Sequence, residues 1–274
     1  MCAGMSYLLE VRNLGKSFMR AGGRLFGEKE DQRFTAVEDV SFEVAPGGTF
    51  AIVGESGCGK TTLARMILRL IEPDHGVVHF AGRDLLKLDG EELRKQRRQM
   101  QMIFQDPFAS LNPRMRVLEI VAEPLAIHEP RLSARERASR AREMLKRVGL
   151  DAAAAKRYPH EFSGGQRQRI GIARALILHP KLVVADEPVS ALDVSVGAQV
   201  LLLLEELQKE FALTYVLISH SLPVVRQLAS HIAVMRRGQM IEYGPANLML
   251  HEPTHAYTKE LLAAVPEIPP YGQV

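Results

Sequence analysis

The chain has 274 residues, of which 46% are apolar and 24% charged, and its net charge is only +3. This composition fits one large globular domain, and no apolar run approaches the ~20 residues of a membrane span, so membrane contact is expected only through partners. The two cysteines, Cys2 and Cys58, lack metal-ligand spacing, which argues against a disulfide framework or an iron–sulfur site.

Strands are predicted where short runs of β-branched or aromatic residues are bounded by glycine, proline or other turn residues. The predicted strands cover residues 8–11, 40–44, 50–53, 77–80, 101–104, 182–185, 215–218, 232–235 and 239–242. Several of them are apolar at every position, which is typical of parallel strands buried on both faces. The chain is therefore expected to have an α/β fold with parallel central strands.

Apolar residues recur at helical spacing between Gly59 and Ile71 and predict a helix directly after the 50–53 strand. The residues of that pattern are Leu63, Ile67, Leu70 and Ile71. The stretch 20–33 is rich in glycine and charge and predicts a long surface loop.

Helical signals dominate from about residue 106 to 166 and predict an inserted helical subdomain. Ser133 and Glu136 form a capping box, and Gly149 is placed to end the helix that they begin. Basic residues are concentrated in 94–98 and 131–147, but interleaved glutamates dilute their field. A solvated surface is expected there rather than a face for lipid or nucleic acid.

Residues 54–61 match G-x-x-x-x-G-K-[ST] and lie between a strand and a helix, as a phosphate-binding P-loop requires. Glycines let consecutive N–H groups curl around phosphate oxygens, and the helix N-terminus adds a favourable dipole. Lys60 is expected to reach the β- and γ-phosphates and Thr61 to ligate Mg²⁺. The expected nucleotide-binding residues here are Gly54, Glu55, Ser56, Gly57, Cys58, Gly59, Lys60, Thr61 and Thr62.

Residues 181–187 form an apolar strand that ends in two adjacent carboxylates, Asp186 and Glu187. At the end of a parallel strand, Asp186 is placed to hold Mg²⁺ through water, and Glu187 can polarise the attacking water. Beside a P-loop, this Walker B pattern predicts phosphoryl transfer to water. The two motifs alone would also fit a kinase, a GTPase or a helicase.

The segment 162–166 separates these possibilities. Ser163 and Gln166 have capping-box spacing, and the glycines between them expose N–H groups that can hold an anion. With this segment the sequence resembles the ABC ATPase family, whose signature motif it matches. The resemblance implies that Ser163, Gly164, Gly165 and Gln166 serve a nucleotide held by the P-loop of a partner subunit.

Further motifs of the family follow in order. Gln105 matches the Q-loop, Asp193 ends the D-loop segment, His220 matches the switch histidine, and Phe18 matches the aromatic residue that stacks on adenine. The resemblance implies a P-loop (RecA-like) core with an N-terminal antiparallel β subdomain and an inserted α-helical subdomain. It implies catalytic roles for Glu187, His220 and Gln105, metal ligation by Thr61, Gln105 and Asp186, and cofactor contacts by Phe18 and Asp193.

The resemblance narrows to the ATPase subunits of oligopeptide and dipeptide permeases and covers nearly the whole chain. It rests on residues 105–114, 157–162 and 252–258. It implies an ATPase domain over 1–250, with its helical subdomain at about 106–166, and a C-terminal extension over 251–274. One branch of these subunits carries a C-terminal cysteine cluster, and its absence here indicates the F-type subunit of a pair.

An F-type subunit implies ATP and Mg²⁺ as cofactors and an ATPase partner that is either a paralogue or an identical copy. It also implies two transmembrane permease subunits and, indirectly, an extracytoplasmic binding protein, with no nucleic acid. The expected location is the cytoplasmic face of the inner membrane. Two alternatives stay open: an ATPase that assists carbon–phosphorus lyase, and import of nickel or glutathione.

The sequence departs from the family pattern at two positions. Ser221 stands where aspartate usually follows the switch histidine, and Gly197 stands where a polar, helix-favouring residue is usual. Gly197 is expected to cost its helix ~1 kcal/mol relative to alanine. Neither residue belongs to the expected site, so activity is expected, and the geometry of His220 is the feature that Ser221 would affect.

Overall fold

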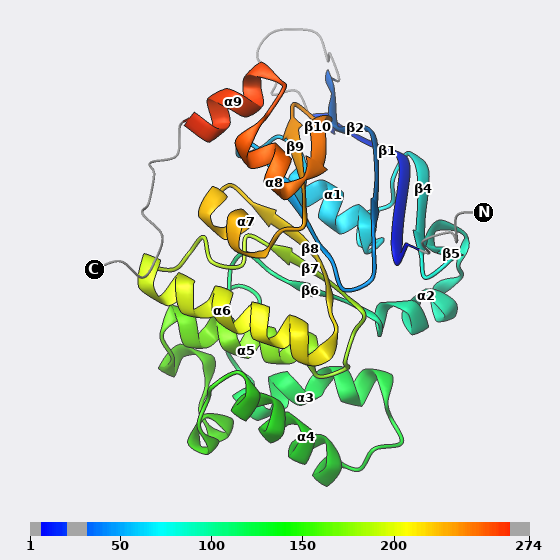
Figure 1. The fold of residues 1–274 in the computed structure, drawn as a ribbon. Coiled ribbons are helices and arrows are strands. Elements are labelled where there is room, and N and C mark those ends of the chain that lie inside the picture. The colour runs from blue at the N-terminus through cyan, green and yellow to red at the C-terminus, as the bar shows by residue number, and fades with distance from the viewer. Residues whose placement is uncertain (1–6, 21–31, 264–274) are drawn as a thin grey trace, which may run out of the picture.

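A computed structural model describes residues 7–20 and 32–263, which form two β-sheets with helices around them (Figure 1). The smaller sheet is antiparallel, with strand order β2-β1-β4-β5, and the larger has the order β10-β9-β3-β8-β7-β6. The smaller sheet contains β1 (Leu9–Arg20), β2 (Gln32–Val44), β4 (His75–Phe80) and β5 (Arg83–Asp84). The larger contains β3 (Thr49–Val53), β6 (Met100–Ile103), β7 (Leu182–Asp186), β8 (Thr214–Ser219), β9 (His231–Arg236) and β10 (Gln239–Pro245).

The centre of the larger sheet is parallel from β9 through β6, and only the edge strand β10 runs antiparallel. Its strands are apolar at successive positions because both faces are covered. Ala51 and Val53 point into one hydrophobic cluster, while Phe50 and Ile52 between them point into the other. The predicted α/β fold with parallel central strands is confirmed.

The first cluster joins this sheet to most of the helices, including the inserted ones below it in Figure 1, and the second joins it to α1 and the antiparallel sheet. The α-helices are α1 (Lys60–Ile67), α2 (Gly90–Arg97), α3 (Val117–His128), α4 (Ala134–Arg147), α5 (Gly164–Leu176), α6 (Val194–Phe211), α7 (Leu222–Leu228), α8 (Ala246–His251) and α9 (Ala256–Ala263). Short 3₁₀ helices cover Leu85–Lys87, Ala152–Lys156 and Pro159–Glu161. Within the described ranges, every helix is too short or too polar to cross a bilayer.

The inserted helices α3 and α4 lie at the end of the molecule farthest from the antiparallel sheet (Figure 1). Ser133 accepts a hydrogen bond from the N–H of Glu136, whose carboxylate bonds back to the N–H of Ser133, so the predicted capping box is present. Gly149 has a φ of 79° just after α4, a conformation that glycine adopts without strain. The helix ends where the sequence predicts.

The predicted helix 59–71 was too long at its C-terminal end. Helix α1 ends at Ile67, and Arg69 then adopts a left-handed conformation with a φ of 48°. The N–H of Leu70 bonds to the carbonyl of Arg65, and the N–H of Arg69 to that of Met66, as in a Schellman motif. The spacing of apolar residues continues to Ile71, so it gives no sign that the helix has ended. A left-handed residue at a helix end is usually glycine, and here it is arginine.

Strands β1 and β2 are much longer than the predicted segments 8–11 and 40–44. Register shifts between Val11 and Ser17 break the alternation that sequence reasoning relies on. The predicted loop 20–33 begins and ends inside these strands, and its residues 21–31 lie outside the described part of the chain.

Candidate functional site

The P-loop connects β3 to α1 and is built around glycines that no other residue could replace without strain. Gly54 and Gly59 have φ angles of 152° and 109°. A Cβ on Gly54 would lie 2.2 Å from the carbonyl oxygen of Met235, and a Cβ on Gly59 would lie 2.1 Å from that of Ala36. The loop is therefore pressed between both sheets, which fixes the direction of its N–H groups.

The ammonium of Lys60 is buried at the centre of this loop, where Lys60 is 5% exposed. It donates hydrogen bonds to the carbonyl oxygens of Gly54 (2.7 Å) and Glu55 (2.8 Å), and Cys58 Sγ lies 3.8 Å away. No carboxylate neutralises it within hydrogen-bonding distance among the described residues. A buried cation held only by neutral groups is suited to receive an anion.

Thr61 and Asp186 lie together, from the first turn of α1 and the end of β7. Thr61 Oγ1 donates to Asp186 Oδ1 at 3.2 Å, and Asp186 is 3% exposed. Burial raises the pKa of Asp186, and the hydrogen bond from Thr61 opposes that rise. Hydroxyl and carboxylate oxygens are donors that suit Mg²⁺, so the pair fits the predicted metal position.

Glu187 lies between the two other residues for which a catalytic role is expected. Its Oε2 accepts a hydrogen bond from Gln105 Nε2 at 2.9 Å, and its Oε1 lies 3.1 Å from His220 Nδ1. The backbone of Glu187 is left-handed, with a φ of 47°, and its N–H bonds to the carbonyl of Ile218 on β8. This conformation is uncommon in a non-glycine residue, and Glu187 shares it with Arg69 at the end of α1.

The signature segment lies against the D-loop of the same chain. Ser163 caps α5 by accepting from the N–H of Gln166, which confirms the predicted capping box. A Cβ on Gly165 would lie 2.2 Å from Val196 Cγ1, and one on Gly164 would lie 3.3 Å from Leu192 Cδ2. Gly165 is thus needed for close packing, whereas a side chain at Gly164 would only require Leu192 to move.

The side chain of Asp193 caps a helix in this chain. Its carboxylate caps α6 by accepting from the N–H of Val196 (2.9 Å) and from the hydroxyl of Ser195 (2.9 Å). The hydrogen bond from Val196 comes first among the causes that lower the pKa of Asp193. The structure therefore does not place the Asp193 carboxylate in the cluster of Lys60 and Glu187.

Phe18 lies on the antiparallel sheet, where its ring is 40% exposed and Lys16 Nζ lies 5.7 Å from the ring centre. It is directly opposite Phe34 on β2, which is 54% exposed. Strand β2 reaches the P-loop at Ala36, so both rings lie on the strand pair that borders the loop. Phe34 was missed from the sequence because it sits beside the segment interpreted as a loop.

A groove of about 730 Å³ runs beside this cluster, between the parallel sheet and the inserted helices. Gln105 and Asp186 line it together with the exposed side chains of Leu70 and Phe104. The groove therefore connects Gln105 and Asp186 to the surface.

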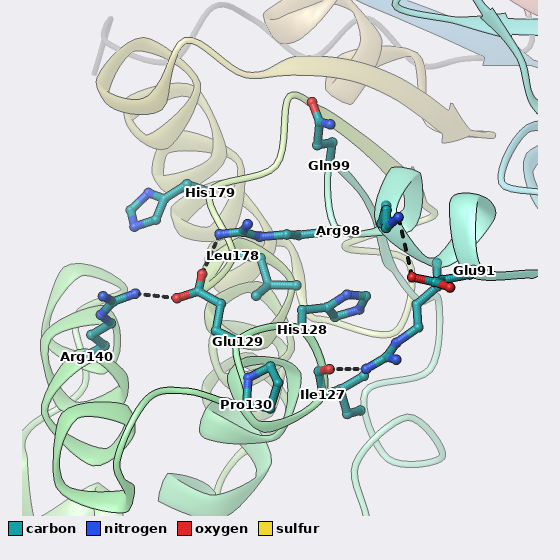
Figure 2. A pocket seen from close by; sticks show the side chains of 12 residues that line it. Glu91, Arg98, Gln99, Ile127, His128, Glu129, Pro130, Arg140, Leu178 and His179 are labelled. Atoms are coloured by element: carbon teal, nitrogen blue, oxygen red, sulfur yellow. Dashed lines mark hydrogen bonds and ion pairs between the residues drawn. The ribbon is translucent and has the colours of Figure 1, made fainter.

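Figure 2 shows a second cavity, of about 870 Å³, which is rich in ion pairs. Glu129, which follows α3, bonds to Arg98 after α2 and, at 2.9 Å, to Arg140 on α4 (Figure 2). Arg94 donates to the carbonyl of Ile127. These bonds join α2 and the residue that follows it to the inserted helices α3 and α4. They give structural partners to three of the arginines in the basic stretches 94–98 and 131–147.

The chain is similar to proteins of known family. The ABC transporter family matches residues 37–190. The oligopeptide transport ATP-binding protein AppF of Bacillus subtilis is 50% identical over 273 residues, which is 99% of this chain and 82% of AppF. The oligopeptide transport ATP-binding protein OppF of Haemophilus influenzae is 49% identical over 259 residues, covering 94% and 78%.

Among solved structures, the ATP-binding cassette MJ0796, a dimer bound to ADP and Pi, superposes with a TM-score of 0.76. The match covers 86% of this chain and 98% of MJ0796 at 31% identity. The sequence motifs, the fold and these similarities agree. The chain therefore belongs to the ABC transporter family and is one of its ATPase subunits.

Proposed function

We propose that this chain binds Mg²⁺ and ATP and hydrolyses ATP to drive peptide import, as the F-type subunit of an oligopeptide or dipeptide permease. The observation that carries the hydrolytic role is the position of Glu187 at the end of the Walker B strand, where its carboxylate accepts a hydrogen bond from Gln105 and lies 3.1 Å from His220 Nδ1. The peptide substrate is taken from the similarity to AppF and OppF.

The residues divide into two groups by their proposed tasks. Lys60 and the N–H groups of residues 54–62 hold the phosphates, and Phe18 packs on the adenine. Thr61, Asp186 and Gln105 hold Mg²⁺, which supplies charge neutralisation at the γ-phosphate. The hydrogen bond from Gln105 to Glu187 uses the Nε2 group of Gln105, so it leaves the Oε1 atom to act as the metal ligand.

Glu187 orients the attacking water and accepts its proton, and His220 fixes the Glu187 carboxylate from the other side. Because Glu187 is held by two neighbours, a change at Gln105 or His220 is transmitted to the group that handles water. Gln105 also lines the 730 Å³ groove, so it is suited to link hydrolysis to a bound partner.

A second ATPase subunit, a paralogue or an identical copy, completes the site. Ser163, Gly164, Gly165 and Gln166 start α5, where exposed N–H groups favour γ-phosphate charge on the facing subunit. Asp193 orders the adjoining D-loop by capping α6. We further propose that one of the two permease subunits docks in the groove of Leu70 and Phe104, which places the chain peripherally on the cytoplasmic face of the inner membrane.

Purification of the tagged chain from detergent-solubilised membranes tests this proposal. Two multi-span proteins and a second ATPase subunit should co-purify, and vesicles that contain the complex should take up a peptide when ATP and the binding protein are present. Nickel and glutathione serve as alternative cargoes in parallel assays. Co-purification with carbon–phosphorus lyase, or ATP-driven uptake of only nickel or glutathione, would overturn the peptide assignment.

A further inference from the structure

The C-terminal helix α9 is anchored to the larger sheet by one carboxylate. Glu242 on β10 accepts hydrogen bonds from Thr254 N–H and Oγ1, both 2.7 Å, and from His255 N–H at 3.2 Å. Burial alone would raise the pKa of Glu242, but the hydrogen bonds from the start of α9 lower it to about 2. The carboxylate thus stays ionised at neutral pH and holds α9 in one place.

Tyr257 on the first turn of α9 is buried by this docking. It is 4% exposed, and its ring lies 4.5 Å from the guanidinium carbon of Arg236 at the end of β9. Its hydroxyl is shielded from solvent and has no hydrogen-bond partner in the part of the chain that the structure describes. A buried hydroxyl without a partner is unfavourable, and most such groups in native proteins are satisfied.

The group next to that hydroxyl is Glu55 of the P-loop. Burial, and after it the neighbouring Glu55 carboxylate, raise the pKa of Tyr257, although the two side chains do not complete a hydrogen bond in the structure. Strand β9, which carries Arg236, also contacts the P-loop. The carbonyl oxygen of Met235, the residue before Arg236, lies against Gly54. Tyr257 therefore borders the first turn of the P-loop.

The state of the loop explains why this hydroxyl matters. Lys60 donates to the carbonyl oxygens of Gly54 and Glu55. If Lys60 turns to a phosphate, as the proposed function requires, both carbonyl groups lose that donor. Glu55 then loses a hydrogen bond that fixes it from inside the loop. A hydrogen bond from the Tyr257 hydroxyl, on the outer side of the loop, can replace part of that restraint.

We propose that Tyr257 is a positioning residue for ATP: its hydroxyl donates a hydrogen bond to the Glu55 carboxylate when Lys60 engages the phosphates, so that the C-terminal extension contributes to nucleotide affinity. This inference rests on the proposed ATP site. It assigns to the 251–274 extension a task within its own ATPase domain, through contacts of Glu242 and Tyr257.

Substitution of Tyr257 by phenylalanine tests the inference, because it removes only the hydroxyl and keeps the ring on Arg236. The isolated Tyr257→Phe chain should bind Mg²⁺-ATP about fivefold more weakly. In the assembled complex, KM for ATP should rise by a similar factor while kcat changes less than about twofold. Tyr243→Phe on β10, where the side chain is 64% exposed, is the matched control and should leave both values unchanged.

Thermal unfolding distinguishes positioning from a merely structural role. Without nucleotide, Tyr257→Phe should melt at the same or a higher temperature than wild type, because an unpaired buried hydroxyl has been removed. The rise in melting temperature produced by saturating ATP should shrink. A lower melting temperature with an unchanged ATP-induced rise would mean that Tyr257 only packs the extension, and the inference would be wrong.

A double-mutant cycle with Glu55→Ala identifies the partner. If the hydroxyl acts through the Glu55 side chain, Tyr257→Phe should weaken ATP binding no further in the Glu55→Ala background. Additive losses would contradict the assigned contact. If the wild-type chain itself bound no ATP, the proposed function would fail; if wild type bound ATP and Tyr257→Phe bound it equally well, only this inference would fail.

Discussion

Gln105 and Glu187 are 82 positions apart in the chain, and their side chains are joined by a 2.9 Å hydrogen bond. The donor lies at the end of β6 and the acceptor at the end of the neighbouring β7, so the parallel sheet brings them together. The other oxygen of Glu187 faces His220, which follows β8. Three adjacent strands therefore deliver the three residues that we assign to hydrolysis.

Replacement of Glu187 by glutamine should separate binding from hydrolysis. The amide keeps the shape of the carboxylate but cannot accept a proton from water. Mg²⁺-ATP should bind within about threefold of wild type, while hydrolysis in the assembled complex falls by orders of magnitude. Binding is measured by equilibrium titration and turnover by phosphate release. Unchanged turnover would remove Glu187 from the mechanism.

Lys60→Ala should weaken ATP binding itself. The substitution removes the buried cation that would meet the phosphates, and it leaves the carbonyl groups of Gly54 and Glu55 without their donor. Affinity for ATP should fall by at least about tenfold in an equilibrium titration. Equal affinities for wild type and variant would show that residues 54–61 are not the phosphate site.

The sequence predicted the elements of the central sheet well because their signals are local. Each strand of the larger sheet was found from a short run of β-branched, aromatic or other apolar residues bounded by turn residues, and Ser133 and Ser163 were found as helix caps from their spacing to Glu136 and Gln166. The P-loop and Walker B positions follow from short motifs. Such features can be predicted because each depends only on which residues occupy a few neighbouring positions.

Features that depend on distant contacts could not be predicted. The end of α1 depends on a left-handed Arg69, a residue type that rarely marks a helix end. The contacts of Glu187 with Gln105 and His220 depend on strand order, which the motifs alone do not reveal. Tyr257 was recognised as part of a C-terminal motif, but only the packing of α9 brings it to Glu55.

Ser221→Asp should raise ATPase activity in the complex. Ser221 is the N-cap of α7, yet its side chain caps no N–H group, and its own N–H bonds to Ser219 Oγ at 2.9 Å. An aspartate there could accept a helix N–H and limit the motion of His220 beside it. We expect about a twofold gain in turnover. Equal or lower turnover would mean that Ser221 does not loosen His220.

Glu129→Gln should destabilise the chain by about 1–2 kcal/mol, because Arg98 and Arg140 lose the carboxylate that holds them together. The Glu129 side chain is 19% exposed, so solvent screens the loss only partly. The control is Glu143→Gln on α4, whose carboxylate is 64% exposed and whose effect should stay within about 0.5 kcal/mol. Chemical denaturation measures both. Equal effects would show that the Glu129 bonds contribute no more than a surface pair.

Gly164→Asp tests whether the signature segment serves the nucleotide of a partner subunit. A Cβ at this position would meet Leu192 Cδ2 at 3.3 Å, a flexible neighbour that can move, so the variant should fold. Its carboxylate would repel γ-phosphate charge on the facing subunit. Gly171→Ala, farther along α5 where a Cβ meets nothing within 4 Å, is the control.

The decisive measurement is ATP binding by the isolated Gly164→Asp chain, paired with ATP hydrolysis by the complex that contains it. We expect wild-type affinity in the isolated chain, no ATP-driven closure of the subunit pair, and hydrolysis reduced by at least about a hundredfold. Loss of ATP binding in the isolated, folded Gly164→Asp chain would show that the signature segment acts on its own P-loop, and the proposed site shared by two subunits would be wrong.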